Sequence, residues 1–527
     1  MSFIKSNLIN CILSGILLVL AWPPISLSPL LFVAFVPLFL TIERCDIKRA
    51  LAFAYLTFFI WSLCTMYWIG HLSVASNGQL ILLMAFLLIP LWMCFPVLVF
   101  LGIKKQIPST SVWLLFPICW VAYEYLHSHW ELAFTWLHLG FGLTPFPSLI
   151  QFYQTTGPLG GTLFILTINV FVFLGIIKWS DTKWRRRLTI GFSLILVAYL
   201  ISNFGSNQSG PKEKVKVAVV QANIDPYVDL TDKSVEEQVQ LIVDLTEPLN
   251  GKNLNLIVCS EGLLRGDSEH PIILNTLDKN PSIDKLKELS QELDAPILIG
   301  VIGVLMSKNQ GLKSPSSIDV SDDTFYDLYN GALLIAHNAP IQFQAKNKLV
   351  PFMERVPFLS HTGFFESLRL SINQMRSSYG RTDKANVFSH ENLRIAPIIC
   401  RDANFPDYVR KFIENGSNIL AVIANDGWAG STAGYQQNAA YSKAIAISMR
   451  RSIARSANTG ESLFIDAEGN SYQNTNWGEQ KVIVRELDVN QRLSFYAVYG
   501  DYLGVLSLAV LILTAFLVIL KRVMKIA

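Results

Sequence analysis

The segment 394–416, RIAPIICRDANFPDYVRKFIENG, decides the fold of the second half of the chain. Its apolar start, 394–399, predicts a buried strand. The part 405–414 predicts a helix that ends at Asn415-Gly416. Cys400 follows the strand directly, at the carboxyl end of a buried strand, where α/β domains place their reactive groups. The segment therefore predicts an α/β domain with Cys400 as a candidate reactive residue.

The alternation of strands and helices continues on both sides of this segment, over residues 214–490. Short apolar runs separated by amphipathic stretches indicate an α/β domain with a buried sheet. Strands are expected at 215–221, 254–259, 296–302, 331–337, 341–346, 394–399, 418–424, 461–466 and 481–486. Helices are expected at 234–246, 283–293, 405–414 and 435–450.

The rest of the chain has the composition of a membrane protein. Of its 527 residues, 51% are hydrophobic and only 16% are charged, which is too apolar for a soluble protein with a polar surface. We expect a seven-helix transmembrane domain over 1–203, a linker over 204–213, an aqueous domain over 214–490, and an eighth transmembrane helix with a basic tail over 500–527. The apolar runs, each near the roughly 20 residues that cross a bilayer, lie at 8–22, 28–42, 50–69, 79–103, 111–126, 160–177, 187–203 and 502–520.

The loops between these runs alternate in charge, which predicts the topology. Lys and Arg follow the second, fourth, sixth and eighth runs, whereas the loops 23–27, 70–78 and 127–159 contain none. The positive-inside rule then places both termini in the cytoplasm and the aqueous domain on the outer side. Lys5 and the run after it also have the outline of a signal peptide. Because Trp22-Pro23-Pro24 is a poor cleavage site, an uncleaved helix is expected.

Three residues that could carry covalent chemistry each follow an expected strand: Glu261, Lys346 and Cys400. Alone, each has a plainer explanation. A Cys that ends an apolar strand is usually a small buried hydrophobe, and a Glu or Lys in a loop is usually solvated. Cys259 could also bridge to Cys400, although two cysteines are not a disulfide framework. Glu124, inside the fifth apolar run, is either a functional carboxylate or the acceptor of a helix-pairing hydrogen bond.

Together, these three residues and their neighbours resemble the nitrilase superfamily. That superfamily has an αββα sandwich with a Glu-Lys-Cys triad, in the order in which Glu261, Lys346 and Cys400 occur here. The resemblance therefore implies this fold for 214–490 and a catalytic role for the three residues. The segments that carry it are Val219–Ile224, Ser260–Glu261, Lys346–Phe352, Cys400–Pro406, Asn425–Trp428 and Ala457–Gly460.

With the apolar runs added, the chain resembles a membrane branch of that superfamily, the apolipoprotein N-acyltransferase family. That family has eight spans with a periplasmic nitrilase domain between the seventh and the eighth. The resemblance implies a multi-pass enzyme of the bacterial inner membrane that N-acylates the diacylglyceryl-cysteine of apolipoproteins, and we expect it to be a monomer. The membrane half is similar in Trp22-Pro23-Pro24, Trp120 with Glu124, Trp136, Gly140 and Asn169.

The chemistry of acyl transfer gives these residues expected roles. A thiol needs a base before it attacks an ester, and Glu261 suits that role. The oxyanion needs positive charge and N–H donors, which Lys346 and the backbone N–H of Arg401 could supply. The thioester on Cys400 would then be resolved by an amine, in ping-pong order. The resemblance implies phosphatidylethanolamine or phosphatidylglycerol as acyl donor, with no metal, cofactor or nucleic acid.

We take Glu354, Arg401 and Asp402 as supporting residues. Glu354 matches a further acid of the family and either assists the triad or forms a structural ion pair, and the apolar segment 356–365 is either a lid or core. The segment Cys400–Pro406 looks more like soluble amidases. Two alternatives therefore stay open: a membrane-tethered amidase that uses water, and an inactive nitrilase domain that serves as a scaffold. The chain departs from the family's usual residues at Ser260, Met353, Arg401, Asp402, Ile445 and Ser448.

Overall fold

The computed structural model describes residues 2–71, 78–204, 213–226, 233–267 and 270–526, apart from 310, 312, 315, 322, 356 and 358–377. It divides into two compact units. The first contains 1–67, 82–208 and 499–527, and the second contains 68–81 and 209–498. Most of the expected linker, 204–213, lies outside the described residues, and so does most of the segment 356–365.

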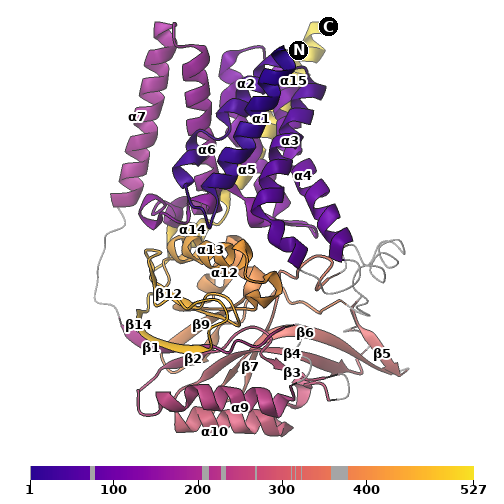
Figure 1. Cartoon of the computed structure of the whole chain (residues 1–527), viewed down its shortest axis with the longest axis vertical. Coiled ribbons are helices and arrows are strands. Elements are labelled where there is room, and N and C mark those ends of the chain that lie inside the picture. Colours follow the sequence, from indigo (N-terminus) through magenta and orange to yellow (C-terminus); the bar gives the residue numbers. More distant parts are fainter. Residues whose placement is uncertain are drawn as a thin grey trace. The chain divides into compact units, whose positions relative to one another are not determined.

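Every apolar run of the sequence forms a helix in the described part of the chain (Figure 1). Five of these helices, α1, α3, α4, α6 and α15, contain stretches that are long and apolar enough to cross a membrane. The membrane character of the chain is thereby confirmed, whereas the count of eight spans stays a prediction. The helices are α1 Ser2–Ala21, α2 Val36–Arg44, α3 Ile47–Thr65, α4 Gly78–Gln106, α5 Phe116–His127, α6 Tyr153–Ile177, α7 Thr182–Phe204 and α15 Tyr502–Ile526.

The other three helices differ from the expected spans for local reasons. Helix α2 has nine residues and α5 has twelve, and each begins next to a proline, Pro37 or Pro117, after a short 3-10 turn. A nine-residue helix is about 14 Å long, roughly half of the hydrocarbon core of a bilayer. Helix α7 begins with the charged run Lys183–Arg187, which shortens its apolar part.

The interior of the first unit combines aromatic packing with one buried carboxylate. Phe35 packs edge-on against Trp120, with ring centres 5.2 Å apart. Glu124 accepts hydrogen bonds from Trp120 Nε1 at 3.0 Å, from the N–H of Leu139 at 2.9 Å and from Thr162 Oγ1 at 2.7 Å. These bonds tie α5 to α6 and to the 3-10 turn between them. The structure therefore supports the helix-pairing interpretation of Glu124.

The described residues of the second unit contain two β-sheets. One has the order β14-β1-β2-β4-β6-β5, with β3 beside β4 and β7 beside β6, and the other has the order β13-β12-β11-β10-β9-β8. The first is built from β1 Lys214–Gln221, β2 Leu256–Val258, β3 Leu264–Arg265, β4 Ile297–Ser307, β5 Ile318–Ser321, β6 Thr324–Ile335, β7 Gln342–Ala345 and β14 Lys481–Asp488. The second is built from β8 Phe388–His390, β9 Leu393–Ile399, β10 Ile419–Ala424, β11 Ile453–Ala457, β12 Leu463–Ile465 and β13 Ser471–Tyr472.

The two sheets pack face to face between two pairs of helices. Val217 and Val219 of β1 belong to the core between the sheets, whereas Ala218 and Val220 belong to the core under α9 (Val235–Thr246) and α10 (Pro281–Glu292), as the period of two in a strand requires. Helices α12 (Pro406–Glu414) and α13 (Ala433–Met449) lie on the opposite side (Figure 1). The second unit is thus the predicted αββα sandwich.

Capping residues set the starts of the outer helices. Ser234 accepts a hydrogen bond from the N–H of Glu237, whose carboxylate reaches back to the N–H of Ser234, so α9 begins with a complete capping box. Asn280 caps α10, and Pro281 occupies its first position. These local signals explain why the expected helix bounds lie within a few residues of those observed.

Parallel pairing brings the ends of several strands to one edge. Strands β1, β2 and β4 run parallel, as do β9, β10 and β11. The residues that follow β2, β9 and β10 therefore leave at the carboxyl ends of parallel strands, where α/β folds form their sites. Cys259 and Cys400 are both free, so no disulfide joins them.

Candidate active site

Glu261 lies in the tight turn after β2, with 6% of its surface exposed. The turn approaches β4 at Gly300, where a Cβ atom would lie 2.5 Å from Glu261 Cα and 2.4 Å from the nitrogen of Gly262. Gly262 has a φ of +61°, in the left-handed region that favours glycine. Two glycines therefore let the Glu261 backbone lie close against the sheet.

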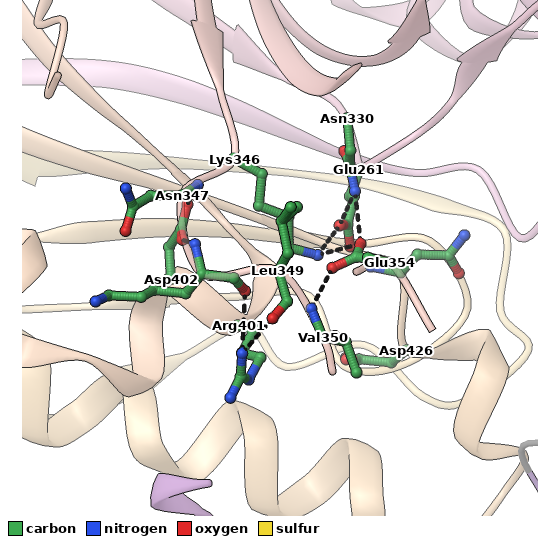
Figure 2. A network of polar contacts seen from close by, with 12 residues as sticks. Glu261, Asn330, Lys346, Asn347, Leu349, Val350, Glu354, Arg401, Asp402 and Asp426 are labelled. Carbon is green, nitrogen blue, oxygen red and sulfur yellow. Dashed lines mark hydrogen bonds and ion pairs between the residues drawn. The ribbon is translucent and has the colours of Figure 1, made fainter. Parts of the chain in front are cut away.

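Lys346 follows β7 and is 1% exposed. Its ammonium Nζ donates to Glu261 Oε1 at 2.8 Å and to Glu354 Oε1 at 2.7 Å (Figure 2). Its backbone N–H donates to the carbonyl of Asn330 at 2.8 Å, which anchors Lys346 to β6. One ammonium therefore bridges two buried carboxylates, and three of the predicted residues meet in a single ion cluster.

Two asparagines that had no predicted role, Asn330 and Asn425, complete this cluster. Asn330 Nδ2 donates to Glu261 Oε1 at 2.9 Å and to Glu354 Oε1 at 3.0 Å. The N–H of Asn425, the first residue after β10, donates to Glu261 Oε2 at 2.9 Å. Both oxygens of Glu261 accept hydrogen bonds, and charge-assisted bonds of this kind fix the orientation of a carboxylate.

Cys400 follows β9 and begins a short 3-10 turn, Cys400–Asn404. Its φ is +48°, in the left-handed region that a residue with a Cβ seldom adopts. Strained backbone of this kind clusters at functional sites. The Cys400 thiol lies in the electrostatic field of Glu261, Lys346, Asp426 and Glu354. The structure thus brings the third strand-end residue within electrostatic range of the ion cluster.

Burial and neighbouring charges raise the pKa values of both Cys400 and Lys346, which keeps the thiol neutral and the lysine charged. Burial and the Glu261 carboxylate raise the pKa of the Cys400 thiol well above its usual value, and Lys346 offsets only part of this shift. Burial alone would lower the pKa of Lys346, but Glu261 and Glu354 raise it well above the usual value. At neutral pH the thiol is therefore protonated and needs a base, whereas the ammonium keeps its proton and supplies a fixed positive charge.

Arg401 and Asp402 bind the loop 346–350, which carries the candidate lysine. Asp402 Oδ1 accepts a hydrogen bond from the N–H of Lys348 at 2.7 Å. Arg401 Nη1 donates to the carbonyl of Leu349 (Figure 2). Burial raises the pKa of Asp402 to about 6 and lowers that of Arg401 to about 10. The two residues therefore hold the backbone between Lys346 and Glu354 in place.

A second buried ion pair supports the turn after β10. Arg455 Nη2 lies 2.9 Å from Asp426 Oδ2, and the exposed fractions of the two side chains are 0% and 4%. Asn438 Nδ2 of α13 donates to Asp426 Oδ1 at 2.8 Å. Since Asp426 follows Asn425, this pair fixes the turn that presents the Asn425 N–H to Glu261.

The residues of the candidate site differ in how clearly the sequence pattern marks them. Glu261, Lys346 and Cys400 could be recognised because each ends an apolar run, and Asn425 belongs to a segment that carried the resemblance. Asn330 was missed because it lies inside a strand, β6. Its only signal was a polar side chain next to an apolar run, and buried polar groups of this kind need partners.

Two family models match this chain. The apolipoprotein N-acyltransferase N-terminal domain matches residues 14–171. The carbon-nitrogen hydrolase model matches residues 216–494, which is more than half of the chain and covers all the residues of the candidate site.

Curated relatives match over nearly the full length. An apolipoprotein N-acyltransferase of Chlorobaculum tepidum is 28% identical over 511 residues, which cover 93% of this chain and 92% of the relative. One of Geobacter metallireducens is 26% identical over 514 residues, which cover 94% and 92%. Among solved structures, a CN-hydrolase superfamily protein of Xanthomonas campestris is 17% identical with a TM-score of 0.35, and the match covers 55% of this chain and 96% of that one.

Proposed function

We propose that this chain, which belongs to the carbon-nitrogen hydrolase family, transfers an acyl chain from a phospholipid to the N-terminal diacylglyceryl-cysteine of apolipoproteins. The observation that carries the proposal is the buried ion cluster of Glu261, Lys346 and Glu354 beside Cys400, in a chain that also has membrane helices. The match to each of the two apolipoprotein N-acyltransferases named above covers 92% of the relative.

In the first step, Glu261 removes the proton from the Cys400 thiol as the sulfur attacks the ester carbonyl of the donor. A sulfur–carbon bond forms, and the negative charge moves to the carbonyl oxygen. The Lys346 ammonium and the backbone N–H of Arg401 stabilise this oxyanion. When the oxyanion collapses, the ester bond breaks and Glu261 returns its proton to the departing alkoxide. The products are a lysophospholipid and a thioester on Cys400.

In the second step, the α-amino group of the apolipoprotein attacks the thioester carbonyl. The nitrogen gives one proton to Glu261, the carbon–sulfur bond breaks, and the Cys400 sulfur takes that proton back. An amide forms, and the enzyme returns to its starting state. Because the lysophospholipid leaves before the acceptor reacts, the kinetics are ping-pong.

Several finer features belong to the same proposal. The catalytic domain lies on the periplasmic side of the inner membrane with both termini in the cytoplasm, as the distribution of Lys and Arg between the loops predicts. The active form is a monomer. Glu354 assists by keeping Lys346 charged and in position, since their atoms lie 2.7 Å apart.

The test is to purify the full chain with phosphatidylethanolamine or phosphatidylglycerol and to look by intact mass spectrometry for an acyl adduct. We expect a hydroxylamine-sensitive adduct on Cys400 that a diacylglyceryl peptide with a free amine removes. Cys400→Ala should lose the adduct, whereas Cys259→Ala, at the other cysteine of the domain, should keep it.

Two results would contradict the proposal. The first is the absence of an adduct with any lipid, together with cells that still make triacylated lipoproteins when they carry only Cys400→Ala. The second is an adduct that decays equally fast with and without an amine, which would identify an amidase that uses water.

A further inference from the structure

Basic side chains gather around two aromatic rings, Phe405 and Tyr408, that follow the nucleophile closely in the sequence. The Lys348 ammonium lies 4.8 Å from the centre of the Phe405 ring, and the Arg401 guanidinium carbon lies 5.0 Å from the same centre. Lys348 and Lys411 each lie 5.9 Å from the centre of the Tyr408 ring. Three cations from three segments therefore lie around two rings at the start of α12, and one of them, Lys411, comes from the last turn of that helix.

These cations are close enough to repel one another. The Lys348 ammonium and the Arg401 guanidinium carbon each lie within 5.0 Å of the centre of the Phe405 ring. Their separation is therefore at most about 10 Å, which is comparable to the screening length in about 0.1 M salt. Burial lowers the pKa of Lys348, and Arg401, Lys411 and Arg381 lower it further, against the opposing effect of Asp402. The cluster thus concentrates positive charge, and such an accumulation attracts an anion.

The cluster is accessible, and one of its residues follows the nucleophile directly in the chain. Lys348 and Arg401 are partly exposed, and Lys411 and Arg381 are exposed. Arg401 is bonded directly to Cys400, where the ester carbonyl of the donor reacts. In a glycerophospholipid, the phosphate and the reacting ester share one glycerol. A donor whose carbonyl lies at Cys400 therefore carries its phosphate only a few atoms away.

We propose that Lys348 and Arg401 form a subsite for the phosphate diester of the acyl donor, with Lys411 and Arg381 at its outer side. The subsite rests on the proposed function, since it binds the donor of that reaction. Arginine suits a phosphate because its planar fork can contact two oxygens, and lysine adds a point charge. Arg401 is one of the positions at which the chain departs from the usual residues of the family it resembles, so the subsite is specific to this chain.

The proposal is tested with the full-length protein and two donors that have the same acyl chains. Phosphatidylglycerol carries the phosphate, and diacylglycerol lacks it. The readout is the initial rate of thioester formation on Cys400 as the mole fraction of donor in the micelle is varied. The quantity compared is the ratio of the two apparent second-order rates, which a general loss of folded protein does not change.

We expect Lys348→Gln and Arg401→Gln each to lower this preference for the phosphate-bearing donor by roughly five- to tenfold, the effect of removing one partly exposed ion pair or charge-assisted hydrogen bond. Most of the change should be in the half-saturating mole fraction. Arg401→Lys should keep most of the preference because it keeps the charge. Lys279→Gln, at an exposed lysine of the 3-10 turn before α10, is the matched control and should leave the ratio unchanged.

Three outcomes separate the possibilities. If the rates with both donors fall in parallel, so that the ratio is unchanged, the cluster has only a structural role and the subsite proposal is wrong. If inorganic phosphate slows the reaction equally with both donors, the cluster binds free phosphate and not the headgroup, which also overturns it. If the unsubstituted protein forms no thioester with either donor, the proposed function itself fails.

Discussion

Glu261 has two opposing effects on Cys400, and one substitution separates them. Its carboxylate raises the pKa of the thiol, and the proposed mechanism also uses it as the base. In Glu261→Gln the negative charge is gone, so the thiol pKa should fall. Alkylation of Cys400 by iodoacetamide should then become faster at pH 8–9, whereas thioester formation from phospholipid should fall by about a thousandfold or more, within the range for loss of a general base.

The measurement is the rate of Cys400 alkylation against pH, read by peptide mass spectrometry, in the same preparation that is assayed for acylation. Glu288→Gln, at an exposed residue of α10, is the control and should change neither rate. Slower alkylation in Glu261→Gln at every pH would mean that the carboxylate activates the thiol more than it suppresses its ionisation.

Asn330 is the second residue whose removal has a defined consequence. Asn330→Ala deletes one amide group that donates to both Glu261 and Glu354, so the two carboxylates lose a shared partner. We expect acylation to slow by about ten- to a hundredfold, the equivalent of one to two hydrogen bonds to charged groups. Asn392→Ala, at an exposed residue between β8 and β9, should leave the rate unchanged. Equal rates for the two variants would contradict the role given to Asn330.

At the scale of elements, Gly300 controls how closely the Glu261 turn approaches β4. In Gly300→Ala the new Cβ would lie less than 3 Å from backbone atoms of Ser260, Glu261 and Gly262, none of which can rotate away. We expect a loss of about 1–3 kcal/mol in stability, as for other overpacked core positions, and a larger fractional loss of acylation, because Glu261 is displaced.

The check is thermal unfolding of the detergent-solubilised chain together with the rate of thioester formation. Gly102→Ala, where nothing lies within 4 Å of the new Cβ, is the matched substitution in helix α4 and should lower neither quantity. A Gly300→Ala protein with unchanged rate and stability would show that the turn can shift without cost.

The Asp426–Arg455 pair joins β11 to the turn after β10 and should behave as a buried ion pair. Arg455→Met leaves the Asp426 carboxylate without its buried partner, and we expect a loss of about 3–5 kcal/mol in unfolding free energy. Adding Asp426→Asn should recover part of that loss, because no unpaired charge remains. Arg394→Met, at an exposed residue of β9, is the control. Full stability of Arg455→Met in thermal unfolding would refute the prediction.

The strands of the sandwich differ in how well they could be predicted from the sequence, and Arg455 is the reason in one case. The apolar strands β1, β2, β9 and β10 were expected near their observed bounds, whereas β4 continues to Ser307, beyond its expected end at 302. Strand β11, Ile453–Ala457, was missed because Arg455 and Ser456 make it look like a loop, although both are buried and paired inside the sheet. The short strands β3, β5, β8 and β13 were missed because two to four residues give no periodicity.

At the scale of the whole molecule, the predicted topology can be measured directly. In a background without exposed native cysteines, Lys279→Cys in the catalytic domain should react with a membrane-impermeant maleimide on intact spheroplasts. Lys48→Cys, in the basic first turn of α3, should react only after permeabilisation, because the positive-inside rule places this end of the helix in the cytoplasm. Labelling in the reverse order would invert the topology.

The division into a membrane part and an α/β domain could be predicted because composition and hydrophobic period differ so strongly between the two parts, whereas the αββα arrangement of that domain was implied by the family resemblance. The helix lengths in the membrane part could not. Helices α2 and α5 begin next to a proline, several residues after the start of the apolar run that contains them. Hydropathy measures only how apolar a segment is, so it does not detect such a boundary. The side-chain contacts of Arg401 and Asp402 also could not be predicted from the sequence, because they depend on the backbone path of the loop 346–350 in the folded domain.

The ammonium of Lys346, shared by two carboxylates, has a consequence for the charge balance of the proposed reaction. The resting group of two carboxylates, one ammonium and a neutral thiol carries one net negative charge. When Glu261 takes the thiol proton, that carboxylate becomes neutral and the substrate oxygen becomes negative, so the sum is unchanged. The step moves an existing charge a short way past a fixed cation and creates no new ion in a poorly hydrated interior, where a new ion would be costly to solvate.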